Sequence, residues 1–126
     1  MSHDTFTLEL PPLAEHLGTA RSFAAAVARH YDVAGETVED LKIAISEGCI
    51  DGLVNGEPLH LHAEETGRAV VFEVDAPEHD DRLPERLALD ELGTPARIEL
   101  IRSLFPDASV VSPDGWRVIR FSVALT

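Results

Sequence analysis

The sequence predicts an α+β fold: a two-layer α/β sandwich in which a mixed, mostly antiparallel sheet carries helices on one face. Short stretches in which apolar and polar residues alternate indicate strands near both ends of the chain and in its middle. Longer stretches with apolar residues three or four positions apart indicate helices between them. The resulting order is β-α-α-β-β-loop-α-β-β. Because no repeated βαβ unit runs through it, the order favours helices gathered on one side of a sheet.

Length and charge limit the possible functions. The chain has 126 residues, 44% of them hydrophobic, which predicts a single domain spanning residues 1–126. Its formal net charge of -13 argues against direct binding of nucleic acid or an anionic membrane and favours basic partners. The single cysteine, Cys49, excludes a disulfide within the chain and indicates a reducing compartment. With neither an apolar leader nor a membrane-length apolar stretch, we expect a cytoplasmic protein.

The first two elements are a short strand and a helix. Apolar and polar residues alternate from Thr5 to Leu10, and two prolines then end the strand. A helix is predicted from Leu13 to Tyr31. Its apolar positions recur at helical spacing: Leu13, Leu17, Ala20, Phe23 or Ala24, Val27 and Tyr31.

The stretch from Val38 to Gly56 predicts one long helix around which the fold is organised. Thr37 is a suitable N-cap, and Asn55-Gly56 is a typical helix end. Its first apolar stripe contains Leu41, Ile45, Cys49 and Leu53. A second stripe contains Ile43, Ile50 and Val54, and the carboxylates between the stripes are Asp40, Glu47 and Asp51.

Two glycines lie inside this helix beside the carboxylates. Gly48 and Gly52 each cost about 1 kcal/mol relative to alanine in a helix interior. Glu47 and Asp51, four residues apart, repel each other as like charges on one helix face. We therefore expect close packing or a ligand near these residues to compensate.

The second half of the chain begins and ends with a hairpin. Strands are predicted at Leu59–Ala63 and Val70–Val74 about a turn at 65–68, and at Ser109–Val111 and Trp116–Leu125. Between the hairpins, residues 75–94 form a long acidic loop whose second half, 83–92, could be a short helix. Such a loop is usually functional or mobile. A further helix starts at Pro95, with Ile98, Ile101, Leu104 and Phe105 on one face.

The stretch DLKIAISEGCIDGLVNG resembles the N-box helix of the GHKL ATPases, and most closely that of the anti-sigma-factor serine kinases of the RsbW and SpoIIAB type. The family pattern is D-x-x-x-A-x-S-E-x-x-x-N-A. Asp40, Ala44, Ser46 and Glu47 match it, whereas Asp51 stands at the family asparagine. The resemblance covers nearly the whole chain, and it implies the Bergerat, or histidine-kinase-like ATPase, fold.

The resemblance also implies roles for four residues around Mg·ATP. Glu47 corresponds to the general base, and Asp51 to the residue that helps hold Mg²⁺. Asp75 could supply the carboxylate that reads adenine, and Gly93 is what remains of the glycine-rich lid. The chain departs from the family because residues 76–92 contain no glycine and Pro95 follows Gly93, which removes an amide donor.

The resemblance therefore leads to two functional hypotheses. The first is a degenerate anti-sigma factor that sequesters an RNA polymerase sigma factor after losing or weakening ATP binding, so that no cofactor is needed. The second is an active serine kinase that uses Mg·ATP to phosphorylate an anti-anti-sigma protein of the STAS type. The family implies a homodimer in either case. A third reading is a GHKL-like domain with an unrelated partner.

Simpler interpretations of the same residues remain open at this stage. Glu47 and Asp51 could belong to an ordinary solvated helix face. His60 and His62, with Glu64 on the same strand face, have a spacing that a metal could use, but an exposed strand face is the more common origin. Cys49 is more typical of packing than of chemistry. Trp116 is expected in the core or at the rim of the last hairpin.

Overall fold

Five strands form one antiparallel sheet. The computed structural model describes residues 3–77 and 93–125, without the side chains of residues 51, 77, 93–95 and 114. The strand order is β1-β2-β3-β5-β4, and all four pairings are antiparallel. The strands are β1 (Thr5–Leu10), β2 (Leu59–Glu65), β3 (Ala69–Pro77), β4 (Ser109–Val111) and β5 (Trp116–Ala124).

The mixed sheet that the sequence predicted is therefore wrong in one respect. Because β3 and β4 both run antiparallel to β5, they run parallel to each other. They are not neighbours, however, since β5 folds back between them. The predicted α+β architecture is confirmed, but each hydrogen-bonded pair in the described sheet is antiparallel.

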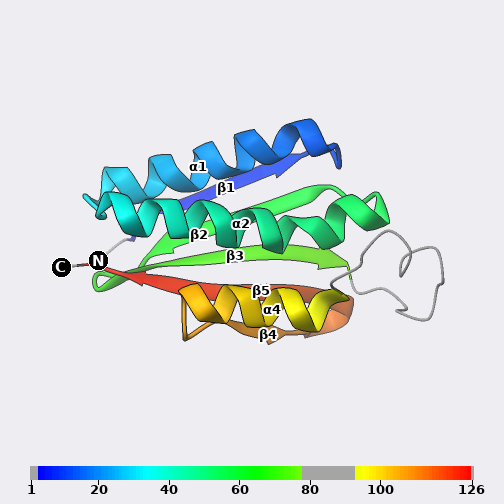
Figure 1. Cartoon of the computed structure of the whole chain (residues 1–126). Coiled ribbons are helices and arrows are strands. Elements are labelled where there is room, and N and C mark those ends of the chain that lie inside the picture. Colours follow the sequence, from blue (N-terminus) through cyan, green and yellow to red (C-terminus); the bar gives the residue numbers. More distant parts are fainter. Residues whose placement is uncertain (1–2, 78–92, 126) are drawn as a thin grey trace.

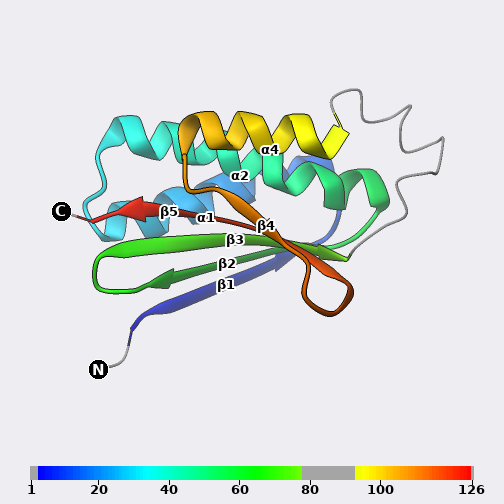
Figure 2. The same ribbon diagram turned by 90° about the horizontal axis from the view of Figure 1, so that it is seen from below.

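The three α-helices in the described residues all cover the same face of the sheet. They are α1 (Leu17–His30), α2 (Gly35–Asn55) and α4 (Gly93–Leu104), with short 3₁₀ turns η1 (Ala14–His16) and η2 (Pro113–Gly115). Figure 1 shows α2 between the other two, and Figure 2 shows the helices stacked over one side of the strands. We call the other side of the sheet the open face, because none of these α-helices covers it.

The predicted starts of the first two helices need correction. Helix α1 begins at Leu17, because Ala14–His16 forms a 3₁₀ turn, and Leu13 before it is 49% exposed. The central helix begins at Gly35, with Ala34 as its N-cap, so the predicted cap at Thr37 lies inside the first turn. The predicted end is confirmed: Gly56 has φ +69°, a left-handed conformation that glycine adopts without strain.

The core lies between the helices and the middle of the sheet. Phe72 of β3 stacks on Phe121 of β5 with ring centroids 6.0 Å apart, and Phe105 stacks on Phe121 at 4.9 Å. Leu41, Ile45 and Cys49 of the first α2 stripe are buried beneath the helix. The alternation and helical spacing in the sequence thus identified this core correctly.

The long acidic loop begins later than expected. Strand β3 continues through Pro77, so Asp75 and Ala76 belong to the sheet. The predicted helix at 83–92 lies outside the described residues. Helix α4 begins at Gly93, two residues before the predicted start at Pro95, and buries Ile98 and Ile101 as expected.

Candidate functional site

Helix α2 packs closely on the sheet at Gly48. A Cβ atom added there would lie 3.1 Å from Cγ2 of Val74 on β3, so a side chain would require Val74 to shift. Gly52 is similarly confined, 3.1 Å from Cδ2 of Leu59. The expected compensation for these two helix-interior glycines is therefore close packing of α2 on the sheet.

Glu47 lies beside this contact and is half-buried. Its Oε2 atom is buried and has no hydrogen-bond partner in the structure. An unsatisfied buried polar atom costs about 1–3 kcal/mol, and such atoms are uncommon in folded proteins. This favours a functional role for Glu47 over an ordinary solvated helix face.

The apolar residues flanking the carboxylates do not form two buried stripes. Ile43 is 47% exposed, whereas Ile50 and Val54 are half-buried. The second stripe therefore faces partly toward solvent, away from the side of α2 that buries Leu41 and Ile45. The carboxylate residues of α2 therefore have a buried apolar stripe on one side only.

Two further predicted site residues can be placed only in part. Asp51 lies in α2, one turn after Glu47, but its side chain lies outside the described part of the structure. Gly93 is the first residue of α4, and the residues before it, 78–92, are outside the described ranges. The expected magnesium and lid roles of these two residues remain predictions.

Asp75 lies on the open face of the sheet, whereas Glu47 comes from a helix on the other face. The inward positions of β3 are Phe72, Val74 and Ala76, all buried, so Asp75 points to the opposite side. It contributes to hollows on that face that are lined also by His60, His62 and Trp116. The structure therefore does not bring Glu47 and Asp75 together around one ligand.

The environment of Asp75 disfavours its charged form. One carboxylate oxygen, Oδ1, is buried without a hydrogen-bond partner in the structure. Burial raises the pKa of Asp75, and the neighbouring charge of Glu73 raises it further. His62, His60 and Arg120 act in the opposite direction. Asp75 is therefore a carboxylate with a raised pKa, and it lies in a setting separate from that of Glu47.

Two buried arginines were not predicted from the sequence. Arg97 of α4 is 3% exposed and Arg117 of β5 is 8% exposed, and both make interactions within the structure. Arg117 has the same strand parity as buried Ile119 and Phe121, so the alternation in β5 could have predicted its inward position. No comparable signal marks Arg97, because its burial depends on how α4 packs.

A side-chain hydrogen bond joins the first two helices near Glu47. Nη1 of Arg21 donates to Oγ of Ser46 at 3.0 Å, and that hydroxyl donates to the Lys42 carbonyl oxygen at 3.0 Å. Arg21 therefore joins α1 to α2. Ser46, which matches the resembled motif, has a structural use in this chain.

The remaining candidate residues are Cys49, His60, His62 and Trp116. Cys49 is 1% exposed, and burial raises the pKa of its thiol to about 12, which disfavours a reactive thiolate. His60 and His62 lie on the open face as predicted, and Trp116 is at the rim, 39% exposed. Within residues 3–77 and 93–125, no three His, Cys, Asp or Glu side chains form a metal-binding group.

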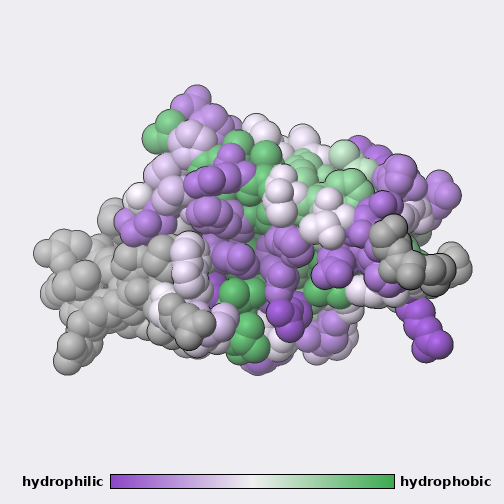
Figure 3. All heavy atoms as spheres, turned by 180° about the vertical axis from the view of Figure 1, so that it is seen from behind, coloured by the Kyte–Doolittle hydropathy of each residue, from purple (hydrophilic) through white to green (hydrophobic). Residues whose placement is uncertain are grey.

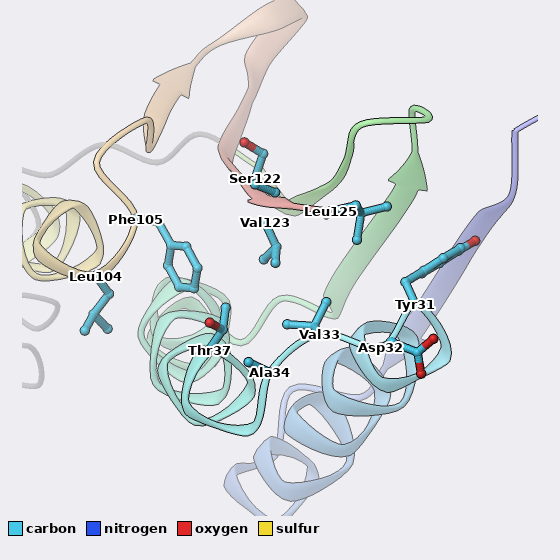
Figure 4. A pocket seen from close by; sticks show the side chains of 11 residues that line it. Tyr31, Asp32, Val33, Ala34, Thr37, Leu104, Phe105, Ser122, Val123 and Leu125 are labelled. Atoms are coloured by element: carbon cyan, nitrogen blue, oxygen red, sulfur yellow. The ribbon is translucent and has the colours of Figure 1, made fainter.

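A separate cavity of about 400 Å³ lies at the other end of the helical layer. Its lining comes from the α1–α2 turn, the end of α4 and the end of β5. Figure 4 shows Val33, Phe105 and Val123 around it, with Thr37 on α2. Thr37 is ten residues before Glu47, or about 15 Å along the helix. This cavity is therefore not part of the Glu47 site.

No protein-family model and no curated protein matches this chain. No helix in the described part of the chain combines the length and apolar character needed to cross a membrane.

Proposed function

We propose that this protein is a binding regulator with a GHKL-like, Bergerat-type fold that sequesters an RNA polymerase sigma factor without using ATP. It acts as a degenerate relative of the anti-sigma-factor serine kinases. The proposal includes an anti-anti-sigma protein of the STAS type as a second partner and a homodimer as the working unit. It operates in the cytoplasm, where sigma factors are found.

The architecture and charge support the proposal. An antiparallel sheet, covered on one face by α1, α2 and α4 in the predicted chain order, agrees with the fold that the N-box resemblance implies. The net charge of -13 suits a partner with basic, DNA-contacting regions and disfavours direct binding to DNA.

The position of Asp75 is the observation that best supports the proposed loss of nucleotide binding. In the resembled family, the N-box carboxylate and the carboxylate after the third strand serve one nucleotide. Here Glu47 lies on the helix side, whereas Asp75 opens onto the opposite face with His60 and Trp116. These residues fit ATP poorly, so the proposal includes no step through it.

Two measurements test this proposal together. Isothermal titration with Mg·ATP and Mg·ADP is expected to give no binding at millimolar nucleotide. In vitro transcription with core RNA polymerase and individual sigma factors is expected to show repression that depends on one sigma factor. Micromolar nucleotide binding, or the absence of repression with every sigma factor of the source organism, would contradict the proposal.

The setting of Glu47 supports a second candidate function, that of an active Mg·ATP-dependent serine kinase. The buried Oε2 atom of Glu47 has no hydrogen-bond partner, which a catalytic role would explain, and the resemblance assigns Glu47 the role of general base. Incubation with a STAS protein and radiolabelled ATP tests it. Phosphate transfer that Glu47→Ala abolishes and Glu39→Ala preserves would favour the kinase, since Glu39 is an exposed carboxylate on the same helix.

A further inference from the structure

The open face of the sheet carries an ordered row of polar side chains. Glu9 of β1 pairs across the strands with His60 of β2, and His60 pairs with Asp75 of β3. Nε2 of His60 lies 3.6 Å from Oε1 of Glu9. The next residue along this row is Val118 of β5. Because directly opposed side chains are in contact distance, Asp75 lies between an imidazole and an apolar side chain.

Negative charge dominates this face. Among its described strand residues, four carboxylates (Glu9, Glu64, Glu73 and Asp75) stand against one guanidinium, that of Arg120. Arg120 is already paired, with Nη2 2.6 Å from Oε2 of Glu73. Figure 3 looks onto this face and shows hydrophilic side chains across much of it. The surplus charge is therefore complementary to a cationic partner.

The aromatic side chain of Trp116 lies next to Asp75 in the same hollow. Trp116 meets His60 edge to face, with ring centroids 5.7 Å apart and planes at 89°. The indole is exposed to 39%, and it borders an open hollow of about 570 Å³. The remaining lining residues are His60, Asp75, Pro113 and Val118. The hollow thus combines the Asp75 carboxylate, one oxygen of which lacks a hydrogen-bond partner, with an accessible aromatic face.

This combination selects one ligand chemistry. A guanidinium is planar, donates to a carboxylate through a fork of N–H groups and stacks on an indole. An anion would meet the four carboxylates, and a metal ion would find no three-residue group among the described side chains. A cation beside Asp75 would also offset the burial and the Glu73 charge that raise its pKa.

We propose that the open-face hollow between Asp75 and Trp116 receives an arginine side chain from a basic segment of the partner protein. The guanidinium donates to the Asp75 carboxylate and stacks on the Trp116 ring, while Glu9 and Glu73 add long-range attraction. The identity of that partner rests on the proposed function, but the arginine site itself does not.

Trp116 is the only tryptophan in the chain, so its fluorescence reports directly on the hollow. The probe is a capped Gly-Arg-Gly-Arg-Gly peptide, compared with the same peptide carrying uncharged citrulline in place of arginine. At physiological salt, the arginine peptide is expected to change the Trp116 emission with saturation, and the citrulline peptide is not. Equal responses to both peptides would overturn the proposal.

Matched variants separate the hollow from the general charge of the face. Asp75→Asn is expected to weaken arginine-peptide binding at least about 10-fold. Glu64→Gln removes one charge from the same face, away from Trp116, and is expected to weaken it less than about 2-fold. Trp116→Ala, followed by calorimetry, is expected to weaken binding as well. Equal losses of arginine-peptide affinity in the Asp75 and Glu64 variants would mean that binding is only non-specific charge attraction, and they would overturn the proposal.

Partner assays distinguish this site from the proposed function. If the arginine peptide does not bind as expected, while the wild type and Asp75→Asn sequester a sigma factor equally well, the arginine site is wrong and the proposed function stands. If the arginine peptide binds as expected but no sigma factor is sequestered, the site stands and the proposed function fails. If sedimentation shows a dimer that Asp75→Asn dissociates, without arginine-peptide binding, a second copy covers the face instead.

Discussion

The two faces of strand β3 differ in what determines the positions of their side chains. Phe72 and Val74 point toward the helices, where Phe72 stacks on Phe121 and Val74 packs closely against Gly48. Glu73 and Asp75 point the other way, where cross-strand pairing sets their neighbours. On the helix side, shape decides which residue is tolerated, whereas on the open face charge and hydrogen bonding decide it. Glu47, from helix α2, lies on the helix side of the sheet, and Asp75 lies on the open face.

Truncating Phe72 should give the largest effect. Phe72→Ala removes a fully buried ring that stacks on Phe121 and is expected to lower the free energy of unfolding by about 3–5 kcal/mol. Its neighbour on the open face provides the control. Glu73→Gln weakens an exposed pair with Arg120 and should cost less than about 1 kcal/mol. Urea denaturation of both variants tests this difference, and similar losses would contradict it.

Filling Gly48 should have the next largest effect. Gly48→Val places methyl groups against Val74, and overpacking of this kind is expected to cost about 1–3 kcal/mol. Gly18→Val is the control, because the nearest atom to an added Cβ is the end of the Arg21 side chain, 3.8 Å away. Gly18→Val is expected to be nearly neutral in thermal unfolding. A harmless Gly48→Val would show that α2 can move away from the sheet.

Replacing Glu47 should stabilise the protein. Glu47→Met removes the buried oxygen that lacks a partner, keeps the side-chain length and is expected to raise the free energy of unfolding by about 1 kcal/mol. Glu39→Met on the same helix loses only an exposed pair with Lys42 and should change stability by a few tenths of a kcal/mol. Denaturant unfolding without ligand measures both. A destabilised Glu47→Met would mean that the carboxylate already has a compensating interaction.

The contribution of Asp75 to the free energy of unfolding should depend on pH. Its pKa is raised in the folded state, so the folded protein holds the proton more tightly than the unfolded chain, whose pKa is about 3.9. The stability contribution of Asp75 therefore falls as pH rises from about 3.9 and levels off above the raised native pKa. Relative to wild type, Asp75→Asn should show no stability difference near pH 3 and a growing advantage above it. An advantage independent of pH would contradict this account.

The sequence could predict much of the fold but less of the candidate site. Strand alternation predicted β1 and both hairpins, and helical spacing predicted the buried stripe of Leu41, Ile45 and Cys49, because burial on one side imposes a period of two or 3.6 residues. The same alternation, extended past Val74, could have assigned Asp75 to the open face. The predicted strand ended at Val74, three residues before the end of β3 at Pro77, because the acidic residues that follow resemble a loop.

The local pattern was sufficient to determine the element types, the buried stripe of Leu41, Ile45 and Cys49, and the helix end at Gly56. Tertiary structure decided the position of β5 between β3 and β4, the Gly48–Val74 contact, and the placement of Trp116 against His60. The reason is physical. Periodicity records whether a side chain faces the core, but not which distant residue it meets there. That choice depends on strand order and helix packing, which involve residues far apart in the chain.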